Sequence, residues 1–172
     1  MSDFLPLFPL QLVVFPGEDL NLHIFEPRYK QLIQECEQGG IPFGIPAFLN
    51  SKVMDVGTEM ELVSVEKRYP NGEMDVKTKG RGVFKILNYY RKAPEKLYPA
   101  GDVEKLEPGR EGDFLQNEKI LEHLRELFDL LNIQKELPAD PNAFRTYDVG
   151  HDAGFSVEQE YALLCISEEK DR

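Results

Sequence analysis

The side chains of this chain that could take part in acid–base or metal chemistry at neutral pH include three histidines, His23, His123 and His151. Two histidines spaced i and i+4 around a glutamate would suggest a metalloprotease zinc site. His123 has no such partner in Glu122-His123-Leu124-Arg125-Glu126, so it predicts no metal site. His151 precedes Asp152, a residue type that orients a catalytic imidazole, but no nucleophile adjoins the pair. We expect all three histidines to be structural.

Motifs for phosphate binding and acyl transfer are absent from the sequence. The Lys77-Thr78 pair lacks the preceding glycines of a phosphate-binding loop, and no G-x-S-x-G nucleophile elbow is found. Cys36 and Cys165 fall on apolar helical stripes, which predicts two small buried side chains. The sequence therefore predicts no catalytic residue, no metal and no cofactor. A hydrolase built from His151, a carboxylate and a serine is kept as the third functional hypothesis.

A run of basic residues with tyrosines between them is the clearest candidate binding feature. Residues 67–96 carry nine basic and three acidic side chains, a net charge of +6, in a chain whose net charge is −11. Basic side chains and stacking aromatics are what single-stranded RNA binding requires, whereas the overall charge argues against general nucleic-acid or membrane binding. A pair of solvated strands explains the run equally well. The candidate binding residues are Lys67, Tyr69, Lys77, Lys79, Arg81, Tyr89 and Arg91.

The first hundred residues, which must position these side chains, have the patterns of strands with one helix among them. Strands are predicted at Phe4–Phe8, Leu12–Phe15, Leu20–Phe25, Pro42–Leu49, Thr58–Tyr69, Met74–Lys79, Val83–Tyr90 and Tyr98–Leu106. Pro27 and Gly39-Gly40 bound the predicted helix. Asn71-Gly72 predicts a type I′ turn with two positive φ angles, and Gly80-Arg81-Gly82 is expected to interrupt the strand that follows.

Beyond a linker at residues 108–112, the pattern is helical. Asp113 with Gln116 and Ser156 with Gln159 are capping pairs that predict helix starts. A short helix is expected within Asn142–Gly150, and the last helix is expected to run to about Glu168. The chain length fits one domain with an appendage, which we divide into 1–108 and 109–172. No apolar run approaches the roughly 20 residues needed to span a bilayer, so a cytoplasmic protein is expected.

The opening of the chain resembles the N-terminal domain of Lon proteases. Three blocks carry the resemblance: Leu5-Pro6-Leu7-Phe8-Pro9-Leu10, then Val14-Phe15-Pro16-Gly17, then Leu22-His23-Ile24-Phe25-Glu26-Pro27-Arg28-Tyr29. Shorter matches follow at Phe43-Gly44, Val56-Gly57-Thr58, Tyr69-Pro70-Asn71-Gly72 and Gly80-Arg81. The resemblance covers roughly the first ninety residues strongly and the helical remainder more loosely.

The resemblance implies an α+β fold: a PUA-like, mostly antiparallel β pseudobarrel of about six strands and one helix, followed by a small helical subdomain. It also implies binding of unfolded or tagged protein segments. The chain differs from full-length Lon in having no phosphate loop and no room for the Ser–Lys protease domain, so it resembles a stand-alone, non-catalytic Lon-domain protein. The family's helical part usually continues further, which leaves open whether residue 172 is the natural C-terminus. Oligomeric state is equally open.

The signature residues of the resemblance are expected to maintain the fold rather than to touch a ligand. They are Pro9, Phe15, Pro16, Gly17, Phe25, Glu26, Pro27, Arg28, Tyr29, Gly80 and Arg81. Among them, Phe15, Phe25 and Tyr29 are predicted core positions, and Glu26 and Arg28 a cap and ion pair. Binding is expected at the strand ends Lys67–Tyr69 and Tyr89–Arg91, or at the seam between the barrel and the helices. The first hypothesis is thus peptide or protein binding, and the second is RNA or nucleotide binding through residues 67–96.

Overall fold

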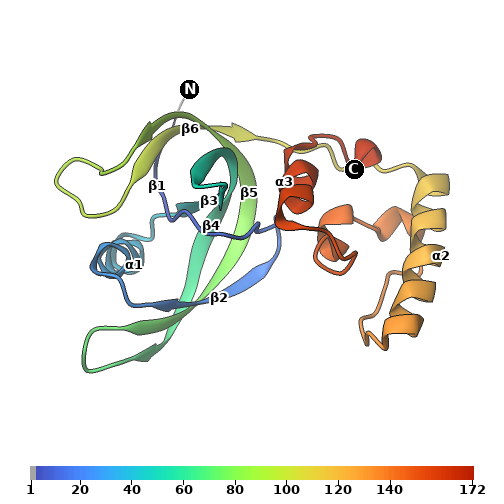
Figure 1. The fold of residues 1–172 in the computed structure, drawn as a ribbon, viewed down its shortest axis with the longest axis horizontal. Helices are drawn as coiled ribbons and strands as arrows, with labels where there is room; N and C mark the ends of the chain where they lie inside the picture. Colours follow the sequence, from blue (N-terminus) through green and yellow to red (C-terminus); the bar gives the residue numbers. More distant parts are fainter. Residues whose placement is uncertain (1–2) are drawn as a thin grey trace. The chain divides into compact units, whose positions relative to one another are not determined.

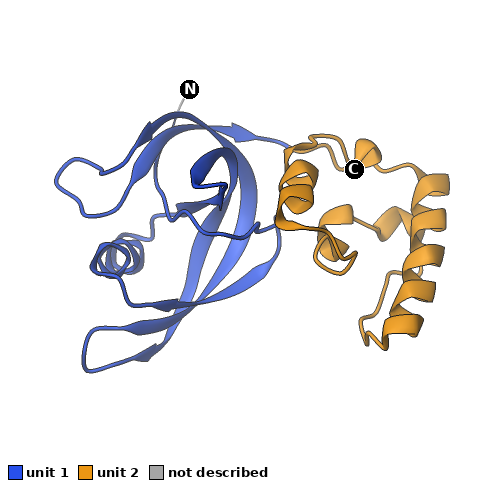
Figure 2. Cartoon of the chain, in the orientation of Figure 1, with its two compact units in different colours: residues 1–107 blue, residues 108–172 orange. Residues whose placement is uncertain are grey.

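The computed structural model describes residues 3–172. The chain divides into two compact units, Met1–Glu107 and Pro108–Arg172 (Figure 2). In its described part, unit 1 contains six strands and one α-helix (Figure 1). These are β1 (Asp3–Pro6), β2 (Asp19–Ile24), α1 (Pro27–Gly39), β3 (Phe43–Leu49), β4 (Lys52–Arg68), β5 (Met74–Tyr90) and β6 (Ala100–Leu106). The number and order of these elements confirm the predicted α+β class.

The strands of unit 1 form one mostly antiparallel sheet that curls on itself. Its order is β1-β6-β5-β4-β3, and β2 is a further neighbour of β5. The chain after β1 closes the curl, because Leu7 and Leu10 make parallel bridges to Gly44 and Ala47 of β3. The Phe8 N–H also donates to the Gly44 carbonyl at 2.7 Å. β5 bends through this arrangement, so both of its ends lie near α1 (Figure 1).

β5 runs unbroken from Met74 to Tyr90, so the predicted interruption at Gly80-Arg81-Gly82 is wrong. Because Gly80 has no side chain, the backbone of Phe15 can pass close to it. A Cβ atom at Gly80 would lie only 2.6 Å from the Phe15 carbonyl oxygen. Gly17, with a φ of +86°, makes the turn at this crossing. The two signature glycines therefore fix the chain that leads into β2.

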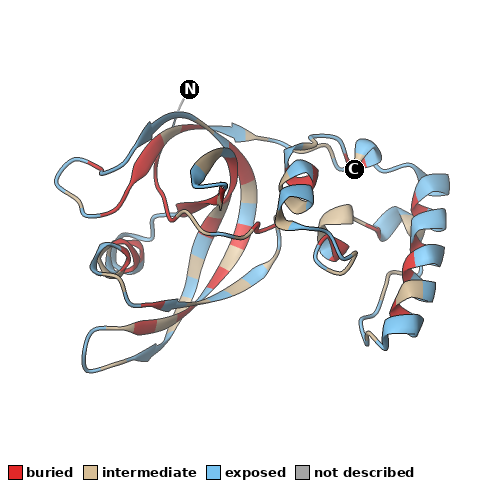
Figure 3. Cartoon of the chain, in the orientation of Figure 1, coloured by how far each residue is buried: buried red, intermediate tan, exposed pale blue. Residues whose placement is uncertain are grey.

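The core of unit 1 lies between α1 and the inner face of the sheet (Figure 3). The predicted stripe of Tyr29, Leu32, Ile33 and Cys36 is buried. Phe8 stacks on Tyr29 with ring centroids 3.7 Å apart. The helix has proline in its first turn and ends at Gly39; Gly40, which caps it, has a left-handed φ of +61°.

Two local predictions in unit 1 fail for identifiable reasons. Leu12–Phe15 forms no strand, although Val13, Val14 and Phe15 are buried; apolar character there reflects burial of an irregular segment. In the β4–β5 turn only Gly72 has a positive φ, so the turn is not type I′. The Asn71 side chain instead accepts a hydrogen bond from the Glu73 N–H at 3.1 Å. This local bond stabilises a wider loop.

Unit 2 is helical, as predicted. Its elements are α2 (Phe114–Leu131), α3 (Val157–Cys165) and the 3₁₀ turns η1 (Pro141–Ala143), η2 (Thr146–Val149) and η3 (Glu169–Asp171). The Asp113 carboxylate caps α2 and Ser156 with Gln159 forms a capping box on α3. α3 ends at Cys165, short of the predicted Glu168, and this last turn leaves Cys165 exposed rather than buried. None of the described helices is long and apolar enough to cross a membrane.

Candidate functional site

The basic residues of segment 67–96 are largely paired with carboxylates. Within the described residues, five of the nine form ion pairs. The pairs are Arg68–Glu37 (2.6 Å), Lys77–Glu66 (3.6 Å), Lys79–Asp19 (3.6 Å), Lys96–Glu35 (2.9 Å) and Arg81–Glu61. Exposed pairs of this kind add little stability. They do neutralise the strip, because the acidic residues 1–66 fold against it.

The candidate binding residues fall at the two ends of β5 rather than in one place. Lys67 and Tyr69 lie at the turn between β4 and β5, whereas Tyr89 and Arg91 lie at the far end (Figure 1). Arg81 lies between them. It lines a hollow of about 270 Å³ together with residues of α1, of β4 and of the loop after α1, where Gly40 and Pro42 lie.

At the turn end, three rings meet in a group that we name the aromatic cluster: His23, Phe25 and Tyr69. The His23 ring lies 5.7 Å from the Tyr69 ring, edge to face, and 6.2 Å from the Phe25 ring. The Lys67 ammonium lies 4.5 Å above the Tyr69 ring, in position for a cation–π interaction. The cluster thus joins the end of β2 to the β4–β5 hairpin.

Phe25 is exposed by 58%, which corrects its predicted place in the core. Ile24, one residue earlier, is 1% exposed and takes the inward position. Because side chains alternate along β2, the next residue points outward. A large exposed apolar ring next to a strand end is a feature that binding surfaces share.

His23 is held between two carboxylates that come from distant sequence. Its Nδ1 lies 2.6 Å from Asp75 and its Nε2 lies 3.2 Å from Glu73. The Tyr69 hydroxyl donates to the other oxygen of Asp75 at 2.7 Å. The hydrogen bond to Asp75 and the nearby negative charge raise the pKa of His23, and the same bond lowers the pKa of Asp75.

We expect the His23 imidazole to titrate above its ordinary pKa of 6.5. Since the folded state raises this pKa, the contribution of His23 to stability is complete below pH 6.5 and is lost as the pH rises through the raised value. The contribution of Asp75, whose pKa is lowered, is lost as the pH falls through that lowered value. Proton NMR titration of the ring checks this. Asp75→Asn should lower the pKa of His23, and a wild-type value at or below 6.5 would refute the assignment.

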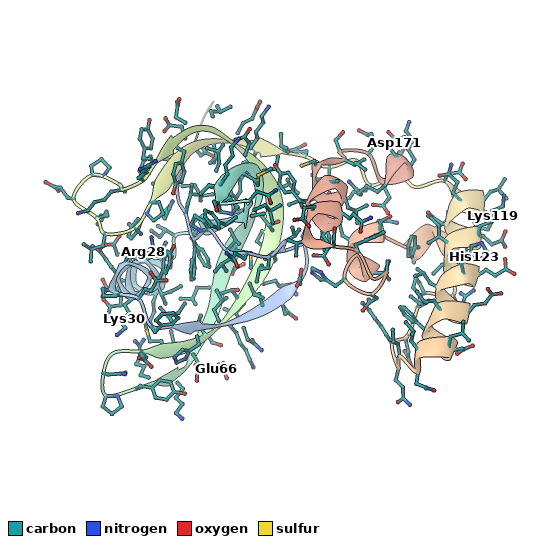
Figure 4. The ribbon with its side chains drawn as sticks, viewed as in Figure 1. Arg28, Lys30, Glu66, Lys119, His123 and Asp171 are labelled. Atoms are coloured by element: carbon teal, nitrogen blue, oxygen red, sulfur yellow. The ribbon has the colours of Figure 1, made fainter. Side chains whose placement is uncertain are left out.

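α1 and β2 together hold the hairpin end in place. Lys30 of α1 donates to the Asn71 carbonyl at 3.0 Å, and Glu37 accepts from Arg68 through both of its oxygens at 2.6 Å. Figure 4 labels Lys30 and Arg28 on α1 and Glu66 on β4. Arg28 bonds to Glu26 at 2.9 Å, as predicted, but the Glu26 side chain makes no helix-cap hydrogen bond.

An open hollow of about 390 Å³ lies beside the aromatic cluster on β2, β4 and β5. Its lining residues are Asn21, Leu22, His23, Glu66, Asp75, Val76 and Lys77. The hollow is therefore lined by both apolar and charged residues. Sequence reasoning placed only Lys77 here, because it could not show that Asp75 and His23 meet.

The far end of β5 carries a different set of aromatic residues. Tyr89 is 39% exposed, and partial burial raises its pKa while the charges of Arg28 and Arg91 lower it. The Tyr90 ring lies 6.3 Å from Phe4, and its hydroxyl donates to Asp102 at 2.7 Å.

Charged side chains surround the groups considered for catalysis in unit 2. His151 contacts Glu160 at 2.8 Å, while Asp152 pairs with Lys135. Burial raises the pKa of the Cys36 thiol to about 12, so it remains protonated at neutral pH. Over residues 3–172, no group of three or more histidine, cysteine or acidic side chains is arranged to hold a metal ion.

Known proteins share the sequence features and the fold of this chain. A family model described as the "ATP-dependent protease La (LON) substrate-binding domain" matches residues 4–164. The crystal structure of a Lon N-terminal domain protein from Xanthomonas campestris has a TM-score of 0.75 and 25% identity, covering 98% of this chain and 94% of that one. The N-terminal domain of Mycobacterium avium complex Lon protease has a TM-score of 0.66 and 15% identity, covering 94% and 89%.

The family match extends over most of the chain, including the signature blocks, β2 and the aromatic cluster. The two solved structures share the fold over nearly the whole length. The chain belongs to the family of Lon substrate-binding domains.

Proposed function

We propose that this domain binds unfolded or tagged polypeptide segments without catalysis, and that the aromatic cluster is the contact surface. The observation that carries the proposal is the exposure of Phe25, held in ring contact with His23 beside an open hollow. Folding does not bury this ring, so its apolar surface is available to a partner. Aromatic residues at such positions supply much of the binding energy in protein interfaces.

Charge favours a protein segment over RNA as the ligand. RNA binding needs phosphate-neutralising side chains that are free of other partners. At the hairpin end, Lys77 already pairs with Glu66 and Arg68 with Glu37, and His23 is flanked by two carboxylates. A phosphate backbone would meet these carboxylates as like charges.

Phe25→Ala is expected to weaken binding of an unfolded polypeptide by roughly thirtyfold, the effect of losing an aromatic anchor of about 2 kcal/mol. The stability of the domain should change by less than about 0.5 kcal/mol, since the ring is mostly exposed. The measurement is fluorescence anisotropy with a reduced, alkylated and labelled protein as ligand.

Phe4→Ala is the matched control, because Phe4 is 54% exposed and lies beside Tyr90 at the other end of β5. We expect it to bind as the wild type does. Weakened binding by Phe4→Ala, with none by Phe25→Ala, would move the contact surface to the Tyr89–Arg91 end. Absence of binding by the wild type at high micromolar concentration would refute the proposal.

A further inference from the structure

β2 is an edge strand with an unusually regular ladder. It pairs with β5 on one side only, over six consecutive residue pairs from Asp19–Lys79 to Ile24–Met74, with no register shift. Edge strands of this kind present unpaired backbone groups to any neighbouring chain.

The register shows which backbone groups point outward. The Gly80 N–H donates to the Glu18 carbonyl at 2.8 Å, just before the ladder begins. Bonded and non-bonded pairs alternate along an antiparallel ladder, so the groups of Leu20, Leu22 and Ile24 face β5. Those of Asp19, Asn21 and His23 face away. Within residues 3–172, no hydrogen bond reaches the outward N–H and carbonyl groups of these three residues.

β5 lies between β2 and β4, so β4 forms the opposite edge of this part of the sheet. That edge is protected. β4 extends beyond its partner β3 from Glu61 to Arg68, and its register against β5 shifts between Leu62 and Ser64 and again between Val65 and Lys67. Bulges of this kind disrupt the row of donors and acceptors that an added strand needs. β2 therefore offers the regular edge.

The side chains of β2 define what an added strand should carry. Leu20 and Leu22 are only partly buried against the core, so apolar side chains opposite them would extend that core. On the outer face, the Asp19 side chain is 80% exposed, and Glu73 and Asp75 lie beside His23. Asp19 remains this exposed although it pairs with Lys79, so a basic side chain on the added strand could still reach its carboxylate. The net charge of −11 disfavours a second copy of this chain as the partner.

We propose that an extended polypeptide segment adds to the outer edge of β2 as a further strand, with alternate apolar and basic residues. This inference rests on the proposed function and specifies its binding mode. The segment would bond to the backbone of Asp19, Asn21 and His23 and continue onto Phe25. Hydrogen bonds to the backbone give affinity for segments of any sequence. The side chains along β2 then favour segments with alternating apolar and basic residues.

The test is a pair of substitutions at Asn21, whose N–H points outward. Asn21→Pro removes that donor and places a ring on the edge, while the ladder bonds to β5 at Leu20 and Leu22 remain. Asn21→Ala removes the side chain but keeps the backbone donor. The probe is a labelled peptide of about eight residues, alternating valine and lysine, and thermal unfolding monitors the fold of each variant.

We expect Asn21→Pro to weaken peptide binding about tenfold or more, whereas Asn21→Ala binds as the wild type does. A peptide N-methylated at alternate residues should bind in one methylation pattern and not in the other. Equal binding by wild type and Asn21→Pro, when both are folded, would overturn strand addition while leaving the proposed function intact if the unfolded protein still binds. Should Asn21→Pro prove unfolded, the two N-methylated peptides decide the question on the wild type.

Discussion

Replacing Phe84 with alanine should destabilise unit 1 by about 3–5 kcal/mol. Phe84 is fully buried on β5 and packs with Leu5, Leu7 and Val103. Its ring fills space that two glycines leave empty. A Cβ atom on Gly44 would lie 2.6 Å from the ring, and one on Gly57 would lie 2.7 Å from it. The side chain therefore joins β5 to β3 and β4 within the curled sheet, and its removal leaves a cavity.

Urea unfolding followed by circular dichroism measures this loss. Phe84→Leu, which keeps most of the apolar volume, should cost less than Phe84→Ala. Leu87→Ala is a matched control on the same strand, because Leu87 is 51% exposed and its truncation should change stability by less than about 0.5 kcal/mol. A loss below about 1 kcal/mol for Phe84→Ala would contradict the packing described here.

Glu169→Ala is expected to destabilise unit 2 by about 3–5 kcal/mol, because it leaves a buried charge without its partner. The Glu169 and Arg172 side chains are 1% and 2% exposed and lie 2.6 Å apart. Arg172 also donates to the carbonyl of Gly109 at 3.1 Å, and its guanidinium lies 4.1 Å over the Tyr147 ring. Glu169 accepts from both the N–H and the hydroxyl of Thr146. One ion pair thus ties together three separate segments of unit 2.

Differential hydrogen exchange separates the effect on the two units. Amides of α2 and α3 should exchange faster in Glu169→Ala, whereas those of β4 and β5 should be unchanged. Glu37→Ala breaks the exposed pair with Arg68 and serves as the control, with an expected cost of about 0–1 kcal/mol. Equal costs for the two variants would show that the buried pair contributes no more than a surface pair.

Sequence patterns predicted the elements whose signals are local. The alternation of Leu20, Leu22 and Ile24 placed β2, and Pro27 with Gly39-Gly40 placed α1. The capping pairs are also local signals, and they correctly predicted where α2 and α3 begin. Signals that depend on distant segments were misread. The Gly80-Arg81-Gly82 pattern predicts a break in the strand, whereas Gly80 makes room for the Phe15 backbone.

The candidate site was predicted only in part. Tyr69 and Lys67 were identified from their types, and they do lie at the aromatic cluster. The sequence alone predicts structural roles for His23 and Phe25. It cannot reveal that His23 pairs with Asp75 and Glu73, because these carboxylates lie about fifty residues further along the chain. Only the register of β2 against β5 brings these groups together. The one local sign of the site is that His23 alternates with the inward-facing Leu22 and Ile24, which places its side chain on the outer face of the strand.

The measurement that tests the central claim most directly is an NMR titration of the domain with a reduced and alkylated polypeptide. If the aromatic cluster binds unfolded segments, the largest backbone shifts should fall on residues 19–25, 67–69 and 73–77. Amides of α2 and of the Phe4–Tyr90 region should move little. Shifts confined to those two regions, or none at saturating polypeptide concentration, would contradict the assignment of this surface.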